Sequence, residues 1–229
     1  MMEFLFLDLD DTILDFHRAE RIALSKTLAD FGVEPTEGVL ARYHVINKQH
    51  WEMLERGELT RDQVLEGRFR VLFAELEHPV NPVAVTRAYE GNLGIGHYFL
   101  PGAREAVEGL SQKYRLFLAS NGTASVQHSR LTSAGLYPYF ETVFISQEIG
   151  HNKPSKEYFD ACFAQIPGFD PEKAMMVGDS LTSDILGGIR AGIRTCWVNP
   201  NHLPPRADIP ADYEIEALSQ LEGLLATLL

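Results

Sequence analysis

The stretch Phe4-Leu5-Phe6-Leu7, followed at once by Asp8-Leu9-Asp10-Asp11-Thr12, decides the fold prediction for this chain of 229 residues. Its first four residues are apolar at every position rather than at alternate positions. That pattern is typical of a strand covered on both faces, as in a parallel sheet. The acidic residues come where such a strand would end, and ligands of open α/β sheets bind beyond the carboxyl ends of the strands. We therefore expect a functional site directly after residue 7.

Further short apolar runs follow later in the chain, and helical patterns separate them. The runs are 116–119, 143–145, 175–177 and 195–198, and the helical patterns lie at about 102–112, 123–135, 155–165 and 182–191. Strand and helix in alternation at this spacing predict repeated βαβ crossovers. We therefore predict an α/β protein with a doubly wound parallel sheet and helices on both faces.

Residues 15–95 have a different pattern. Their apolar residues recur at helical spacing, and glycine and proline mark the turns between the segments. The simplest explanation is an all-helical insert after the first strand. We predict a core domain of residues 1–14 and 96–229, interrupted by a helical domain of residues 15–95.

Composition excludes several classes of protein. With 20 Lys+Arg against 32 Asp+Glu, the net charge of −12 disfavours binding to a nucleic-acid polymer, although a local basic pocket could hold one small phosphate ester. No apolar run reaches the roughly 18 residues of a membrane helix, and the start of the chain lacks a basic signal-peptide region. Cys162 and Cys196 have no partner at metal-site spacing, which indicates buried thiols in a reducing compartment. We expect a soluble, cytoplasmic protein with no membrane partner.

Polar residues follow the other predicted strands in the same way that the aspartates follow the first. Ser120-Asn121-Gly122 could cradle a phosphoryl oxygen at the start of a helix. Taken singly, each of these groups is more often a capping turn or a solvated side chain. Their recurrence at successive strand ends favours one shared site. The remaining members are Lys153-Pro154, Gly178-Asp179-Ser180 and Asp184.

These motifs, in this order, resemble those of the haloacid dehalogenase superfamily of phosphohydrolases. The resemblance spans essentially the whole chain and implies a Rossmann-like core with residues 15–95 as a helical C1 cap domain. Within the superfamily the chain is similar to bacterial pyrimidine 5′-nucleotidases of the YjjG type. The stretches that carry this closer similarity are Asn47-Lys48 with Trp51, Gly57 to Thr60, Arg68-Phe69, and residues 184–197.

The predicted chemistry requires a cation, because bare carboxylates would repel a phosphate dianion. Asp8 and Asp179 carry hard oxygen ligands that suit Mg²⁺, which also accepts a substrate phosphate oxygen. The resemblance adds the backbone carbonyl of Asp10 as a third ligand. Mg²⁺ is therefore the cofactor that we expect.

The resemblance also implies a role for each site residue. Asp8 would attack phosphorus and form an aspartyl-phosphate, and Asp10 would protonate the leaving oxygen and then deprotonate the hydrolytic water. Lys153 would balance charge on the phosphoryl group, and Asp184 would orient Lys153 or a metal-bound water. The phosphate-binding residues would be Ser120, Asn121 and Lys153.

Several functions remain open at this point. The favoured one is hydrolysis of a nucleoside 5′-monophosphate, and the alternatives are a sugar phosphate or phosphoglycolate. A 2-haloacid dehalogenase would need neither Asp10 nor a metal, and a non-catalytic binding module would not need this complete set of residues. Trp51 could stack on a pyrimidine base, although an aromatic residue at helical spacing more often packs in a core. The oligomeric state cannot be predicted.

Overall fold

The computed structural model describes residues 2–228, which divide into two compact units. Of the described residues, the first comprises 2–16 and 97–228, and the second comprises His17–Gly96. The sequence pattern places the corresponding boundaries at residues 14–15 and 95–96. The helical unit is therefore an insertion between two segments of the α/β unit.

The α/β unit is built on a six-stranded sheet in the order β3-β2-β1-β4-β5-β6, in which every neighbouring pair is parallel. The predicted fold class is therefore confirmed. β1 lies inside the sheet because the chain adds strands on both of its sides. The strands are β1 (Phe4–Leu7), β2 (Arg115–Ser120), β3 (Thr142–Ile145), β4 (Ala174–Gly178), β5 (Arg194–Val198) and β6 (Tyr213–Ile215).

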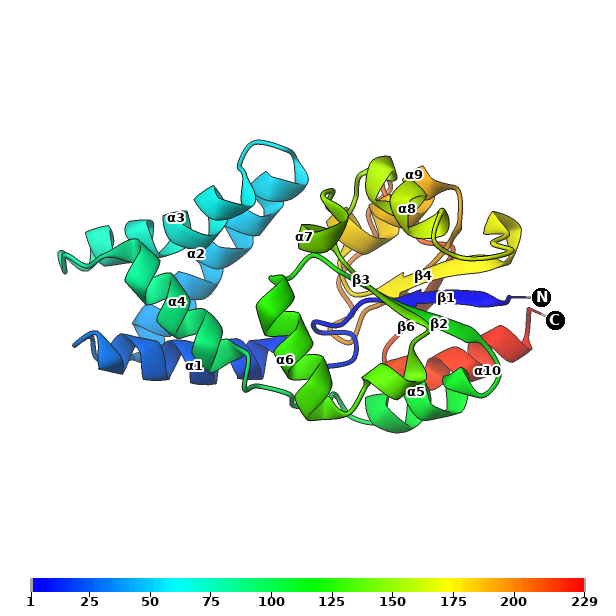
Figure 1. Cartoon of the computed structure of the whole chain (residues 1–229), viewed down its shortest axis with the longest axis horizontal. Coiled ribbons are helices and arrows are strands. Elements are labelled where there is room, and N and C mark those ends of the chain that lie inside the picture. The colour runs from blue at the N-terminus through cyan, green and yellow to red at the C-terminus, as the bar shows by residue number, and fades with distance from the viewer. Residues whose placement is uncertain (1, 229) are drawn as a thin grey trace. The chain divides into compact units, whose positions relative to one another are not determined.

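Helices cover both faces of this sheet, as the uninterrupted apolar strands require. Leu5 and Leu7 of β1 join one core cluster, whereas Phe4 and Phe6 join the cluster on the opposite face. Figure 1 shows α8 and α9 on one side of the sheet and α5 and α10 on the other. The helices on the leucine side are α5 (Ala103–Ser111), α6 (Ala124–Ala134) and α10 (Leu221–Ala226), and those on the phenylalanine side are α8 (Lys156–Phe163) and α9 (Leu186–Ala191).

Two elements differ from the sequence prediction. The predicted helix at 182–191 begins with a π-helical turn, η3 (Leu181–Ile185), before α9. The sequence does not predict the strand β6. It has only three residues, lies at the edge of the sheet and buries only one of them, so it has no apolar run. The remaining short elements are α7 (Ser146–Ile149) and the 3₁₀ turns η1 (Tyr137–Tyr139), η2 (Pro171–Lys173) and η4 (Leu218–Gln220).

The second unit contains helices and turns throughout its described residues. Thr36 and Thr60 cap two of its helices, and Thr60 with Gln63 forms a capping box. The helices are α1 (Phe16–Asp30), α2 (Glu37–Glu55), α3 (Arg61–Glu75) and α4 (Pro82–Leu93). Their core includes an aromatic cluster of Tyr43, Phe69 and Tyr89, with ring centroids 5.1 to 5.7 Å apart. Trp51 lies outside that cluster, half-buried on α2, with the Arg61 guanidinium 5.6 Å from its ring centroid.

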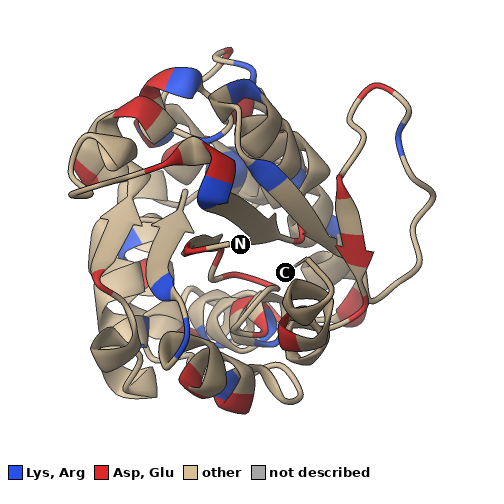
Figure 2. Ribbon diagram, turned by 90° about the vertical axis from the view of Figure 1, so that its right-hand side faces the viewer, with Lys and Arg blue, Asp and Glu red and all other residues tan. Residues whose placement is uncertain are grey.

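Charged residues of both signs are interspersed over the helices, as Figure 2 shows from the side where both termini lie. Within residues 2–228, no helix combines the length and the apolar character that a membrane crossing requires.

Candidate active site

The site begins where β1 ends. The Asp8 amide still pairs with the Val177 carbonyl of β4 at 2.9 Å, so the neighbouring strand fixes the backbone of Asp8. The chain then turns sharply at Asp11, whose φ of 55° lies in the left-handed region. The Asp11 carboxylate stabilises this turn by accepting the Phe16 amide at 2.9 Å. The nucleophile predicted from the sequence is thus held at the carboxyl edge of the sheet, and its residue is 7% exposed.

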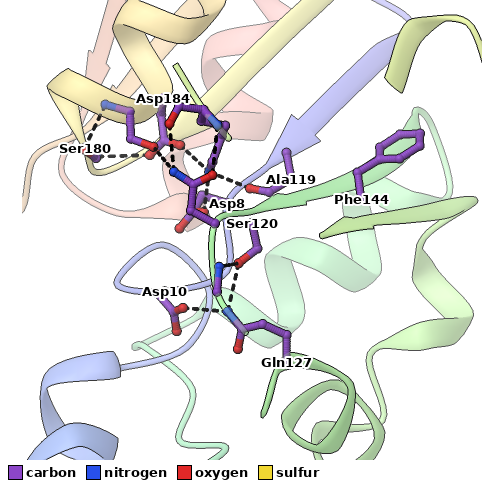
Figure 3. Close-up of polar contacts among 12 residues, drawn as sticks. Asp8, Asp10, Ala119, Ser120, Gln127, Phe144, Ser180 and Asp184 are labelled. Atoms are coloured by element: carbon purple, nitrogen blue, oxygen red, sulfur yellow. Dashed lines mark hydrogen bonds and ion pairs between the residues drawn. The ribbon is translucent and has the colours of Figure 1, made fainter. Parts of the chain in front are cut away.

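The buried side chain of Lys153 contacts groups at or after the ends of three strands, β1, β2 and β4. Its ammonium donates to Asp8 Oδ1 at 2.7 Å, to Asp184 Oδ1 at 2.6 Å and to the Ala119 carbonyl at 2.6 Å. Figure 3 labels Asp8, Ala119 and Asp184, which provide the three acceptors. Burial alone would lower the pKa of Lys153, but attraction from Asp184 and Asp8 outweighs it and raises that pKa. Lys153 is therefore a fixed positive charge beside the predicted nucleophile.

A cluster of three carboxylates lies around this ammonium. One oxygen from each of Asp8, Asp179 and Asp184 lies within 4.8 Å of the others. Asp184 is oriented by Lys153 and by the Ser180 amide, which donates to Asp184 Oδ2 at 3.1 Å. A Cβ on Gly178 would lie 2.1 Å from that oxygen, so only glycine at the end of β4 admits Asp184.

The charges of this cluster fit a divalent cation. Three carboxylates against one ammonium leave two negative charges in a buried place, and one Mg²⁺ would balance them. Burial, with repulsion from Asp184 and Asp10, raises the pKa of Asp8 to about 8 despite Lys153. Burial and repulsion from Asp184 and Asp8 likewise raise the pKa of Asp179. Oxygen ligands of this hardness are those that Mg²⁺ prefers.

Ser120 and Asn121 lie at the end of β2, and their side chains have different surroundings. The Ser120 hydroxyl oxygen accepts the Gly122 amide at 3.1 Å and Gln127 Nε2 at 2.8 Å, so its own hydrogen can be donated to a ligand. The Asn121 amide group accepts the Lys153 backbone N–H and donates to the Lys153 carbonyl, both at 2.9 Å. In this structure Asn121 holds the backbone of Lys153, and its predicted contact with phosphate stays a prediction.

The structure separates Asp10 from the three-carboxylate cluster and adds two residues that the sequence analysis missed. The Asp10 carboxylate binds Arg130 through Oδ1 and Gln127 through Oδ2, the latter at 2.7 Å. The role predicted for Asp10 in metal binding involves its backbone carbonyl, so these side-chain contacts do not compete with it. The sequence does contain a signal for these two residues. Gln127 and Arg130 are polar residues at i, i+3 on the buried side of α6, the helix that follows the Ser120-Asn121-Gly122 motif.

The helical unit holds a separate polar cluster. Buried Glu20 accepts His44 Nδ1 at 2.8 Å and Asn47 Nδ2 at 2.6 Å, and Arg68 donates to Asn47 at 2.9 Å. His17 lies beside it, with its ring centroid 4.9 Å from that of His44. Histidine spacing in the sequence could not show this pairing, because α1 and α2 bring the residues together. Both carboxylate oxygens of Glu20 accept hydrogen bonds from side chains of α2. We therefore interpret this cluster as a structural hydrogen-bond network.

Residues 2–192 match the family model of haloacid dehalogenase-like hydrolases, which is most of the chain. The chain belongs to the haloacid dehalogenase-like hydrolases. The fold, the site at the strand ends and the family model agree on this assignment. The predicted family is confirmed, and the protein is a hydrolase.

Relatives of nearly full length exist among these hydrolases. The HAD-hydrolase YfnB of Bacillus subtilis is 39% identical over 96% of this chain and 94% of its own length. The crystal structure of YfnB bound to magnesium matches with a TM-score of 0.94 over 98% of both chains.

Two relatives are named as pyrimidine 5′-nucleotidases. PynA of Streptococcus pneumoniae is 36% identical over 96% of this chain and 93% of its own length. YjjG of Escherichia coli is 32% identical over 97% of both chains. The resemblance to pyrimidine 5′-nucleotidases, inferred from the motifs, is therefore confirmed for this haloacid dehalogenase-like hydrolase.

Proposed function

We propose that this protein is a Mg²⁺-dependent phosphatase of small phosphate monoesters and that its substrates are pyrimidine nucleoside 5′-monophosphates. One observation carries the reaction class: buried Asp8 is bound by Lys153 and lies in a carboxylate cluster that fits one divalent cation. The substrate class is supported by the near full-length similarity to PynA and YjjG. The helical unit is proposed to act as the cap domain.

Asp8, Asp179 and the backbone carbonyl of Asp10 would hold Mg²⁺, with Asp184 beside them. When bound, Mg²⁺ would offset the repulsion between the carboxylates and the substrate phosphate and would stabilise charge on the phosphoryl oxygens. YfnB, whose structure matches with a TM-score of 0.94, was crystallised with magnesium.

In the first step a carboxylate oxygen of Asp8 attacks phosphorus as the bond from phosphorus to the leaving oxygen breaks. Asp10 gives its proton to that oxygen, and the free alcohol leaves. Lys153 and the hydroxyl of Ser120 stabilise the phosphoryl oxygens, where negative charge is concentrated in the transition state. Asp8 is then an aspartyl-phosphate and Asp10 a carboxylate.

In the second step water attacks phosphorus of the aspartyl-phosphate, and Asp10 accepts a proton from it. The bond from phosphorus to the Asp8 oxygen breaks, which releases inorganic phosphate and restores both aspartates. Asp184 keeps Lys153 in place through the 2.6 Å ion pair. Each group therefore returns to its starting protonation state.

Release of inorganic phosphate from a panel of esters tests this function. The panel contains UMP, dUMP, dTMP, AMP, a hexose phosphate and phosphoglycolate, each with Mg²⁺ and with EDTA. We expect turnover of the pyrimidine nucleotides with Mg²⁺ and none with EDTA. Turnover of sugar phosphates alone would contradict the substrate class, and release of chloride from 2-chloropropionate without Mg²⁺ would contradict the reaction class.

Asp8→Asn tests the nucleophile. The amide cannot form the aspartyl-phosphate, so we expect phosphate release to fall by at least about 1,000-fold. Thermal unfolding should show that the variant is folded. The matched control is Asp208→Asn, which changes an exposed aspartate that is paired with Arg206. An Asp8→Asn variant that keeps most of its turnover would refute the role given to Asp8.

A further inference from the structure

Asp10 is held by a closed network of side chains from α6. Arg130 donates to Asp10 Oδ1, and Gln127 Nε2 donates to Asp10 Oδ2 at 2.7 Å and to Ser120 Oγ at 2.8 Å. The same Arg130 nitrogen also donates to Gln127 Oε1 at 3.1 Å. Figure 3 shows Gln127 lying between Asp10 and Ser120. Both oxygens of Asp10 are thus fixed from one helix.

Burial makes this network different from a surface ion pair. Arg130 is 0% exposed and Gln127 is 1% exposed, whereas the Asp10 side chain keeps 27% exposure. Buried charges in folded proteins are paired, because an unpaired one is costly to desolvate. Of these three side chains only that of Asp10 is partly exposed, so the network fixes a side chain that stays open to solvent on one side.

The backbone after β2 is shaped to admit this network. Gln127 and Arg130 stand at i, i+3 on α6, which places them on one face of the helix. A Cβ on Gly122 would lie 2.4 Å from Gln127 Nε2, so a glycine is needed where Gln127 reaches Ser120. The network thus depends on the same Ser120-Asn121-Gly122 turn that the sequence analysis assigned to phosphate binding.

We propose that Gln127 and Arg130 are positioning residues that hold the Asp10 carboxyl group in register with Ser120 for proton transfer to the leaving oxygen. The inference rests on the proposed function, because it assigns a purpose to contacts of the acid–base residue. Gln127 is the bridge: its two amide hydrogens bind one oxygen of the acid–base residue and one oxygen of the phosphate-binding serine. A displacement of either would change the distance between proton donor and phosphoryl group.

The test uses the leaving group to separate positioning from folding. The parameter kcat/KM covers the steps up to departure of the leaving group, so it excludes the attack by water. A ribose 5′-oxygen needs a proton to leave, whereas p-nitrophenolate leaves without one. For Gln127→Met and Arg130→Met we expect kcat/KM on UMP to fall about 10- to 100-fold, part of the 10²- to 10⁴-fold that general acid catalysis provides. On p-nitrophenyl phosphate we expect a change of less than about 3-fold for Arg130→Met. For Gln127→Met, which also loses the bond to Ser120, we expect a smaller loss than on UMP.

A double-mutant cycle with Asp10→Asn completes the test. Asp10→Asn should show the same dependence on the leaving group, and adding Arg130→Met or Gln127→Met to it should cause no further loss on UMP. Arg130→Lys, which keeps the charge, should restore part of the activity. The matched control is Arg115→Met, which removes a cation that is paired with Glu141 in the same unit. We expect this variant to keep the wild-type kcat/KM on both substrates.

Thermal unfolding of every variant accompanies the kinetics. If Arg130→Met does not fold, Gln127→Met and Arg130→Lys provide the test, since neither leaves a buried charge without a partner. Equal losses on both substrates, or further losses in the Asp10→Asn background, overturn the inference while the wild type remains active. A wild type that hydrolyses neither ester overturns the proposed function and the inference with it.

Discussion

At the scale of single residues, the site is dominated by the balance of charge around Lys153. One ammonium contacts two carboxylates and a backbone carbonyl, and a third carboxylate, Asp179, completes the cluster. Burial strengthens each interaction, because a low dielectric increases both attraction and repulsion. The result is a lysine that stays charged and aspartates that favour a cation.

The two cysteines provide a prediction about pH. Burial raises the pKa of both Cys162 and Cys196 to about 12. Because the shift is upward, the thiols stay protonated at pH 8, with a thiolate fraction of about 10⁻⁴. We expect DTNB to label the native protein at least about 1,000-fold more slowly than an unstructured cysteine peptide. The native rate should rise with pH up to pH 10, and two thiols should react after unfolding. A plateau near pH 9 would contradict the burial of the thiols.

At the scale of the elements, the strand ends and the turns after them position the chemistry. β1, β2 and β4 deliver Asp8, Ser120 and Asp179 to one edge, because parallel neighbours end together. The π-helical turn η3 then brings the Asp184 carboxylate back to the Ser180 amide and to Lys153. π-Turns inside helices are frequent at functional sites.

Gly178→Ala tests the close approach of Asp184 to β4. The added methyl would meet the Asp184 carboxylate, so we expect a loss of about 1 to 3 kcal/mol in the free energy of unfolding together with a loss of phosphatase activity. Gly223→Ala in α10 is the matched control, because a Cβ added at Gly223 would meet no atom within 4 Å outside its own helix backbone. That substitution should be neutral or stabilising by about 0.5 to 1 kcal/mol. Denaturant unfolding measures both, and equal effects would contradict the packing argument.

The sequence predicts the elements of this site better than it predicts their contacts. The uninterrupted apolar strands and the polar residues after them are local patterns, so the sheet and Asp8, Lys153 and Asp179 could be named in advance. The Arg130–Asp10 ion pair joins residues 120 positions apart, and no local pattern encodes it. The local pattern at 182–191 predicts a regular helix, and it does not encode the π-helical turn η3 or the contact of Asp184 with Lys153, 31 residues away.

At the scale of the whole molecule, the excess of negative charge and the site are connected. The net charge of −12 disfavours nucleic-acid polymers, yet several of the acidic residues form a compact cluster that fits a cation. A single phosphate ester needs only a local balance of charge. The acidic composition is therefore compatible with a phosphorylated substrate.

Stability in the presence of Mg²⁺ tests that connection. A cation that binds only the folded protein adds about 2.7 kcal/mol at 100 times its Kd, which corresponds to a rise in Tm of roughly 5 to 10 °C for a chain of this size. Asp179→Asn removes a proposed ligand and also a partly buried charge that the neighbouring carboxylates repel. We expect it to raise Tm without metal and to reduce the shift with Mg²⁺. Scanning calorimetry checks both, and an undiminished shift in Asp179→Asn would contradict the assignment of the ligand.

The central place of β1 has a consequence for how the protein is made. β1 comes first in this sequence, but it pairs with β2 and β4, which follow about 110 and 170 residues later. At the usual pace of translation, β4 follows β1 by on the order of ten seconds, during which an uninterrupted apolar strand has no native partner on that side. The ribosome thus produces Asp184 well after Asp8. A nascent chain interrupted before residue 184 cannot assemble the three carboxylates of the proposed site.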